Sequence, residues 1–290
     1  MNAYSKKDKI YGYVNVVLLG IFALMTLYPF IYVLASSMSS GAAVSSGQVM
    51  FFPKEINFSA YKQVLVDKEL WISYGNTFFY TIVGTLTSLA ITITGAYALS
   101  KKRLYGRKYL NMLVAFTMWF NAGMIPFYLN LRDLDLLNSR FGIIIAFACN
   151  AFNIILLRNY FESVPASLEE AARIDGANEF QILKNVYIPL SKPAIITVGL
   201  FYAIARWNGY FWSMILLKDA SKIPLQVYLK KMIVEMSLGD DAMQIAMSAK
   251  HSPETLVYTI IVVAIIPVVI IYPFIQKYFN KGILVGGVKE

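Results

Sequence analysis

A short charged segment between long apolar stretches holds the residue types with the clearest chemistry in this 290-residue chain. The segment reads Glu170-Ala171-Ala172-Arg173-Ile174-Asp175-Gly176 and closes with Val186-Tyr187-Ile188-Pro189. Two adjacent alanines let a partner approach the backbone closely, and the carboxylates of Glu169, Glu170 and Asp175 can pair with basic groups around that partner. The pattern therefore predicts a docking element rather than a catalytic site.

Helix-capping signals in this segment predict two short helices. Ser167 and Glu170 have the spacing of a capping box, which predicts a helix over 168–175 that ends at Gly176 in the left-handed conformation. A second helix is predicted to start at Asn178 and to stop near Pro189. Helices below roughly 12–15 residues are marginal in water, so both need a surface to pack against. On this physics alone, a solvated helical hairpin between two membrane helices is the simpler alternative to a docking element.

The rest of the chain has the composition of a membrane protein. Hydrophobic residues make up 58% of it and charged residues only 15%, and its mean hydropathy is +0.56. A helix of about 20 residues crosses a hydrocarbon core of roughly 30 Å. Six apolar segments are long enough to do so: 12–35, 75–99, 109–130, 141–158, 193–217 and 255–276. We predict an all-α fold, with one domain over 1–290 and small residues such as Gly84 and Ser88 where helices pack closely.

The distribution of Lys and Arg predicts which loops lie in the cytoplasm. Basic residues gather before the first span, between 101 and 108, and after the sixth span, so both termini are predicted to be cytoplasmic. The predicted outside loops are 36–74, 131–140 and 218–254, although the last carries five lysines. The net charge of +9 is explained by this topology and by anionic lipid, so nucleic-acid binding is not predicted.

The sequence lacks the residues that several classes of chemistry require. There is no His-Glu-x-x-His motif, nucleophile elbow or glycine-rich phosphate loop, which excludes the common enzymatic interpretations. A single cysteine, Cys149, and a single histidine, His251, cannot assemble a metal site. None of the six predicted spans contains Asp or Glu, the residues with which gradient-driven carriers bind or transfer ions. Uphill transport by this chain would need energy from another subunit.

The charged segment resembles the signature of the membrane subunits of bacterial binding-protein-dependent ATP-binding-cassette importers. That signature, Glu-Ala-Ala-x-x-x-Gly-x9-Ile-x-Leu-Pro, is matched with two conservative aliphatic substitutions by Glu170-Ala171-Ala172, Gly176, Val186, Ile188 and Pro189. The resemblance covers nearly the whole chain, including Asn76-Thr77 and Ala96-Tyr97-Ala98-Leu99-Ser100. The chain is similar to the carbohydrate branch of the family, to the second, shorter permease of the maltose importer and to permeases for polysaccharide fragments.

The resemblance implies a mechanism and a set of partners. A second, unlike permease would complete the pathway, two ATPase subunits would bind ATP and Mg²⁺, and an extracytoplasmic solute-binding protein would deliver a saccharide. This chain would hold no cofactor or metal and would not be an enzyme. The loop 159–192 would carry a cytoplasmic coupling helix between the fourth and fifth spans, with coupling through 168–187. The coupling contact would be made by Glu170, Ala171, Ala172, Asp175 and Gly176.

Polar and aromatic residues at membrane depth are the candidates for saccharide contacts, because amides and guanidinium groups bind hydroxyls and aromatic faces stack on sugar rings. These candidates are Trp119, Asn121, Asn150, Asn153, Arg206, Trp207, Asn208 and Tyr210. The alternative, favoured for most of them, is that the aromatic residues pack helices together and the amides join helix pairs. Arg206 differs, because a charge near the centre of a helix costs at least about 2.5–3.5 kcal/mol and needs a cavity or a partner. Two alternatives for it are weighed equally. One is a contact to hydroxyl or carboxylate groups of a saccharide, for which an acidic sugar would explain the charge best. The other is a structural tie to a backbone carbonyl or to an acidic group of the companion permease.

The sequence thus predicts a permease subunit of an ATP-driven oligosaccharide importer in the bacterial cytoplasmic membrane. An importer of the same family for another solute is the nearest alternative. A gradient-driven carrier and a membrane enzyme are the alternatives from other classes.

Overall fold

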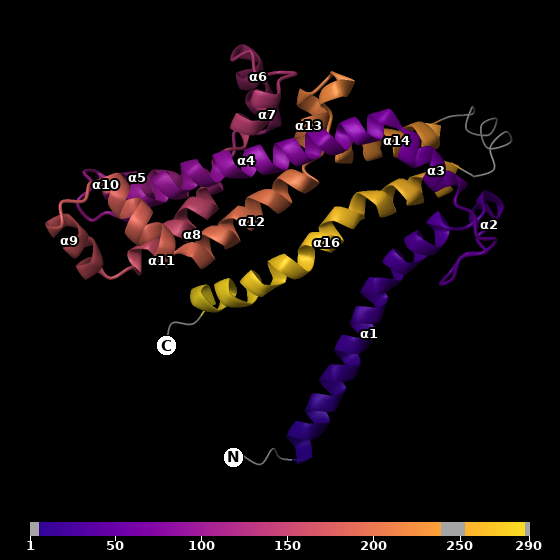
Figure 1. Ribbon diagram of the computed structural model, residues 1–290, viewed down its shortest axis with the longest axis horizontal. Helices are drawn as coiled ribbons and strands as arrows, with labels where there is room; N and C mark the ends of the chain where they lie inside the picture. Colours follow the sequence, from indigo (N-terminus) through magenta and orange to yellow (C-terminus); the bar gives the residue numbers. More distant parts are fainter. Residues whose placement is uncertain (1–5, 239–252, 288–290) are drawn as a thin grey trace. The chain divides into compact units, whose positions relative to one another are not determined.

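The computed structural model describes residues 6–238 and 253–287, and this part of the chain is helical, without strands (Figure 1). The chain forms two compact units. The first joins Met1–Lys68 to Leu229–Pro267, and the second joins Glu69–Tyr228 to Val268–Glu290. The all-α prediction is confirmed, and the prediction of one domain stays a prediction.

The first unit has a long apolar helix and a small core at one end of it. Helix α1 (Lys6–Ser37) leaves most of its large apolar side chains exposed, as a helix surrounded by lipid does. The short helices α2 (Gly41–Ser45) and α3 (Ser59–Val66) follow it, and part of α16 (Pro253–Gly287) belongs to the same unit. The Tyr32 ring of α1 meets the Tyr258 ring of α16 edge-on, at 5.7 Å between ring centroids.

The second unit is built along α4 (Lys68–Ser100), a continuous helix of 33 residues. Helix α12 (Lys192–Asn208) runs beside α4 (Figure 1). The buried hydroxyls of Thr92 and Tyr202 join the two helices at 2.7 Å. Gly199 leaves room for the Leu89 side chain, which a Cβ at position 199 would approach to 3.1 Å. Small residues therefore let these helices pack closely, as the sequence predicts.

Shorter helices complete the second unit. In chain order they are α5 (Arg107–Trp119), α6 (Met124–Asp133), α7 (Arg140–Ala146), α8 (Ala151–Glu162), α9 (Ala166–Ile174), α10 (Glu179–Ile182), the π-helix η1 (Leu183–Tyr187), α11 (Ile188–Leu190), α13 (Phe211–Leu216), the 3₁₀ helix η2 (Ala220–Lys222) and α14 (Leu225–Leu238), which continues into the first unit. A core cluster of buried residues from α4, α8, η1 and α12 includes Ala96, Leu157, Tyr187 and Val198.

The predicted count of six spans is not confirmed. Among the described residues, Ile10–Ser37 and Lys68–Ser100 are each long and apolar enough to cross a membrane. Three further pairs of helices meet at sharp bends, so up to five spans result if each pair counts as one. The described part of α16 contributes a shorter apolar helix, Glu254–Ile270. The length and composition of these helices fit a protein that crosses the membrane several times.

The third predicted span, 109–130, is interrupted rather than continuous. Helices α5 and α6 meet at 116°. In the break, the side chain of Asn121 accepts a hydrogen bond from the Gly123 amide at 2.8 Å, and Gly123 has a φ of +88° that favours glycine. An asparagine turn and a glycine therefore end α5, although the segment is apolar enough to cross the membrane.

The fourth and fifth predicted spans are also interrupted. Helices α7 and α8 meet at 54°, and Asn150 caps the start of α8 by accepting a hydrogen bond from the Asn153 amide at 3.1 Å. The fifth predicted span, 193–217, is divided into α12 and α13 by Gly209 and Tyr210. Apolar composition predicts membrane depth, but turns formed by Asn and Gly decide where each helix ends.

Candidate functional site

The predicted docking segment forms α9 and α10 at the end of the second unit where α4 ends (Figure 1). Helix α9 begins at Ala166 after Pro165, and its N-cap makes no side-chain hydrogen bond. The capping box predicted for Ser167 and Glu170 is therefore wrong, because the helix starts earlier, with Pro165 as its N-cap, and Ser167 lies inside the first turn.

The predicted end of the first short helix is confirmed. Gly176 has a φ of +80°. The Gly176 amide donates to the Arg173 carbonyl and the Ala177 amide donates to the Ala172 carbonyl, both at 3.0 Å. These two bonds are the Schellman motif, which satisfies the last carbonyls of a helix and favours glycine at the left-handed position.

The second short helix starts where the sequence predicts. The Asn178 side chain accepts from the Gln181 amide at 2.9 Å, and the Gln181 side chain accepts from the Asn178 amide at 2.8 Å, so Asn178 and Gln181 form a capping box. The helical path continues through η1 to Leu190, one residue beyond Pro189, and then bends by 86° into α12.

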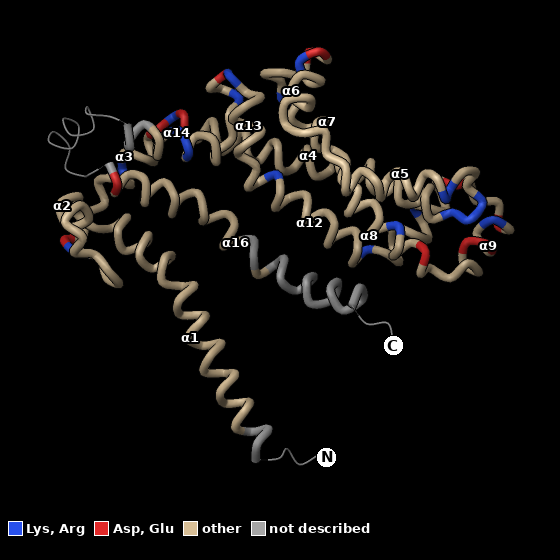
Figure 2. Tube along the Cα trace, turned by 180° about the vertical axis from the view of Figure 1, so that it is seen from behind, with Lys and Arg blue, Asp and Glu red and all other residues tan. Residues whose placement is uncertain are grey.

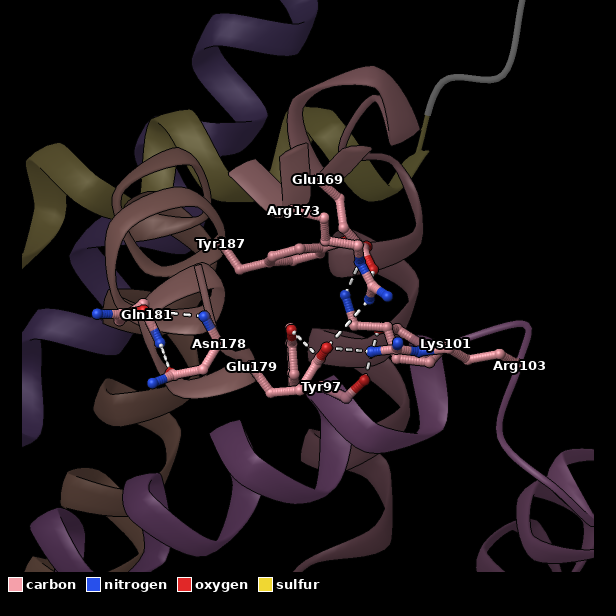
Figure 3. A network of polar contacts seen from close by, with 10 residues as sticks. Tyr97, Lys101, Arg103, Glu169, Arg173, Asn178, Glu179, Gln181 and Tyr187 are labelled. Carbon is pink, nitrogen blue, oxygen red and sulfur yellow. Dashed lines mark hydrogen bonds and ion pairs between the residues drawn. The ribbon is translucent and has the colours of Figure 1, made fainter. Parts of the chain in front are cut away.

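A network of polar contacts fastens this segment to the end of α4 (Figure 3). The Lys101 ammonium lies 2.7 Å from a Glu169 carboxylate oxygen, and the Tyr187 hydroxyl donates to the same oxygen at 2.5 Å. Arg173 pairs with the other oxygen of Glu169 from one turn further along α9. The Lys101 ammonium also lies 3.9 Å and 3.8 Å from the ring centroids of Tyr97 and Tyr187. Glu169 is therefore paired within its own chain, and its pairing with a partner protein stays a prediction.

A second carboxylate extends the network. Glu179 accepts a hydrogen bond from the Tyr97 hydroxyl at 2.8 Å and pairs with Arg103 and with Arg173, the latter at 3.1 Å. Arg173 thus joins the carboxylates of α9 and α10. Figure 2 shows basic and acidic residues gathered at this end of the second unit.

The charge state of Glu169 follows from its partners. Burial by itself raises the pKa of this carboxyl, but the hydrogen bonds from Lys101 and Tyr187 and the positive charge of Lys101 outweigh burial and lower the pKa to about 2. The carboxylate is therefore ionised at neutral pH. Sequence reasoning missed Lys101 and Tyr187 as its partners, because it used the basic cluster at 101–108 only to orient the membrane helices.

The opposite side of the segment is exposed. Ile174 and Phe180 expose 87% and 70% of their surface, and Leu168 exposes 43%. Glu170, Ala171, Asp175 and Gly176 are exposed as well, whereas Ala172 is half-buried against the core of the second unit. Four of the five predicted docking residues are therefore accessible, together with apolar side chains that the prediction did not include.

A cleft of about 720 Å³ lies within the second unit, between α7, α8, α12 and α13. Five of the eight candidate pathway residues line it: Asn150, Asn153, Arg206, Asn208 and Tyr210. Aromatic side chains that sequence reasoning missed complete the lining, among them Tyr80, Phe147, Phe201, Tyr202, Phe211 and Trp212. No residue that lines this cleft, in the part of the chain that the structure describes, is Asp or Glu.

The other three candidates lie elsewhere. Trp119, at the end of α5, exposes 89% of its surface, and Asn121 lies in the exposed break that follows. Trp207 is buried, and its ring meets the Phe78 ring edge-on at 5.3 Å. The packing alternative therefore holds for Trp207.

Arg206 is fixed by the broken end of α7. Its guanidinium donates to the Ile143 carbonyl at 2.7 Å and to the Ile144 carbonyl at 2.9 Å. Because α7 ends at Ala146, carbonyls of its last turn lack amide partners from a continuing helix, and the negative end of the helix dipole favours a cation. Gly84 makes room for this side chain, since a Cβ there would lie 2.9 Å from Nε of Arg206. Arg206 thus binds backbone carbonyls of its own chain, and its side chain also lines the cleft.

Comparison with known proteins identifies a family and similar proteins. The family described as "Binding-protein-dependent transport system inner membrane component" matches residues 106–285. The polygalacturonan/rhamnogalacturonan transport system permease protein YtcP of Bacillus subtilis is 40% identical over 281 residues, which cover 97% of this chain and 96% of the relative. The arabinooligosaccharides transport system permease protein AraQ of the same species is 26% identical over the full length of both chains.

A solved structure shares the fold over nearly the whole length. It is a chain in the crystal structure of a bacterial ABC transporter involved in the import of the acidic polysaccharide alginate. That chain is 60% identical to this one, with a TM-score of 0.91, and the match covers 96% of this chain and 100% of the other.

Proposed function

Because this chain belongs to the family of binding-protein-dependent transport system inner membrane components, we propose that it is one of two unlike permeases in an ATP-driven importer. The importer translocates an oligosaccharide or polysaccharide fragment across the cytoplasmic membrane of a bacterium. Two ATPase subunits bind ATP and Mg²⁺, and an extracytoplasmic solute-binding protein delivers the saccharide. Both termini of this chain lie in the cytoplasm, where its basic clusters favour them.

The cleft in the second unit is the observation that carries the proposal of a saccharide. Its lining combines aromatic faces, three asparagines and one guanidinium without a carboxylate. Aromatic faces stack on sugar rings, and amides bind their hydroxyls. The positive charge of Arg206 has no acidic partner among the lining residues, and it favours an acidic saccharide over a neutral one. The import of acidic alginate by the transporter that contains the 60% identical chain supports the same choice.

The ATPase subunits dock on the segment 168–187, through the accessible residues Glu170, Ala171, Asp175 and Gly176. The exposed side chains of Ile174 and Phe180 support this proposal, because exposed apolar groups of this size gain from burial at an interface. The Schellman turn at Gly176 holds them in place.

Uptake by the complete importer in proteoliposomes tests the function. We expect accumulation of a uronate oligosaccharide that requires ATP and the binding protein, and weaker accumulation of a neutral oligosaccharide of equal length. Vesicles that contain only this chain should accumulate neither saccharide under a proton or sodium gradient. Gradient-driven uptake by the single chain would instead establish the carrier alternative.

Docking is tested by a separate variant. Ile174→Asp places a charge at the centre of the proposed contact, so less ATPase should co-purify with the permeases. Val66→Asp is the matched control, because Val66 is 83% exposed but lies in α3, within a predicted outside loop. Equal recovery of the ATPase with both variants would contradict docking on this segment.

A further inference from the structure

We propose that Lys101 is a positioning residue that joins the docking segment to α4, so that a movement of the segment displaces α4 and α12 together at the cleft. The inference rests on the proposed function, since it requires ATPase subunits that move α9 and α10. It assigns to Lys101 a role distinct from the exposed residues that contact the ATPase.

The position of Lys101 differs from that of an ordinary surface lysine. Its side chain is 8% exposed, and that of Glu169 is 17% exposed. Tyrosine rings from α4 and from η1 both lie against the ammonium (Figure 3). A cation removed from water to this degree needs its carboxylate and its aromatic neighbours, because no solvent replaces them when they separate.

Three separate elements meet at this one cation. Lys101 directly follows α4, Glu169 belongs to α9, and Tyr187 belongs to η1 at the start of the path into α12. A second link runs from Tyr97 of α4 to Glu179 of α10. Any movement of α9 and α10 that keeps these contacts must therefore carry the end of α4 with it.

The far parts of α4 and α12 reach the cleft. The bond between Thr92 and Tyr202 joins the two helices, and Tyr202 itself lines the cleft. Further along, Gly84 of α4 lies against the Arg206 side chain of α12, and Tyr80 lines the cleft itself. The two helices run side by side over this distance (Figure 1). A displacement at the Lys101 network thus reaches the lining of the cleft through paired helices rather than through a loop.

The test is Lys101→Met in the complete importer, reconstituted with both permeases, the ATPase subunits and the binding protein. The methionine keeps the apolar stem and removes the charge. We expect wild-type recovery of the ATPase subunits and continued ATP hydrolysis, with the amount of saccharide transported per ATP reduced by about fivefold, within the range found for residues that couple distant sites. Lys101→Arg keeps a cation that can pair with Glu169 and stack on tyrosine, so it should restore most of the transport per ATP.

Lys102→Met is the matched control, because Lys102 is the neighbouring lysine and is exposed. If Lys101→Met and Lys102→Met transport the same amount of saccharide per ATP, the proposal is overturned. Glu169→Gln is a second way to remove the ion pair while keeping the shape of the side chain, and it should also lower transport per ATP. Loss of the assembled complex with both Lys101→Met and Glu169→Gln would assign the pair to folding alone and would overturn the proposal as well.

Failure of the proposed function would look different. The wild-type chain would then fail to bind ATPase subunits, or its uptake would not depend on ATP. Once the wild type assembles and transports, the ratio of saccharide to ATP in the Lys101 variants alone decides the role of Lys101.

Discussion

Replacement of Arg206 by methionine tests whether this side chain stabilises the broken end of α7. Methionine fills the space beside Gly84 but donates no hydrogen bond. Two charge-assisted bonds, to the carbonyls of Ile143 and Ile144, are lost. At about 1.5–3 kcal/mol each they contribute roughly 3–6 kcal/mol. Removing the charge also removes the cost of holding it at membrane depth, about 2.5–3.5 kcal/mol, which offsets part of this loss.

The middle values of these two ranges, about 4.5 and about 3 kcal/mol, predict a net destabilisation of about 1.5 kcal/mol. At about 2–4 °C per kcal/mol for chains of 150–250 residues, the midpoint of thermal unfolding should fall by roughly 5 °C. The measurement is the fraction of intact permease pair that remains after heating, followed by size-exclusion chromatography with fluorescence detection. Arg206→Lys keeps the charge but not the planar fork, so its midpoint should lie below that of the wild type.

Arg132→Met is the control for the loss of an arginine as such. Arg132 and its neighbour Asp133 are both more than half exposed, and an exposed pair of this kind contributes little to stability. If Arg206→Met and Arg132→Met unfold at the same temperature, the carbonyls of α7 do not depend on the guanidinium and the reasoning is refuted. If uptake falls while the midpoint stays unchanged, the guanidinium contacts the saccharide instead.

Three other positions give tests of single contacts. Gly84→Ala should displace the Arg206 side chain, because the new Cβ would lie 2.9 Å from Nε, and thermal unfolding should show a loss of stability that is absent when Gly84→Ala is combined with Arg206→Ala, whose side chain does not reach position 84. Gly176→Val should disrupt the Schellman turn, because a β-branched residue is disfavoured at a φ of +80° by roughly 1–3 kcal/mol. Saccharide-stimulated ATP hydrolysis at the wild-type rate in that variant would contradict the docking assignment. Glu169 has a pKa lowered from 4.5 to about 2, so the stability that its ionised form contributes is fully present above about pH 4.5 and is lost as the pH falls toward 2. The difference in unfolding midpoint between the wild type and Glu169→Gln should therefore shrink across this pH window, and a difference that is constant with pH would show that the carboxylate charge is not responsible.

The interrupted helices in the apolar part of the chain share one structural feature. Breaks after Trp119, Ala146 and Asn208 place backbone groups without helical partners inside apolar segments. Such groups are tolerated at membrane depth where protein atoms satisfy them or where they line a cavity. At the end of α7 both conditions hold, since Arg206 binds the carbonyls and the same side chain lines the cleft.

Much of the docking segment was predictable from the sequence. The turn at Gly176 and the cap at Asn178 depend on hydrogen bonds between residues three to five positions apart, and these spacings are fixed by helix geometry. The error at Ser167 is local as well, since Pro165 occupies the N-cap position and Ser167 lies within the helix. The membrane class likewise follows from composition, because a bilayer requires long apolar helices whatever their arrangement.

Only the tertiary structure decided which side of each helix contacts which neighbour. Glu169 and Glu170 are adjacent in sequence, yet one lies in the network with Lys101 and the other is exposed. Lys101 is 68 positions from Glu169, and Arg206 is 63 positions from Ile143. Composition and helix periodicity determine that such charges need partners, because an unpaired charge away from water is costly. They do not determine the partners, because contacts over this separation depend on the rotation and the ends of every helix between them.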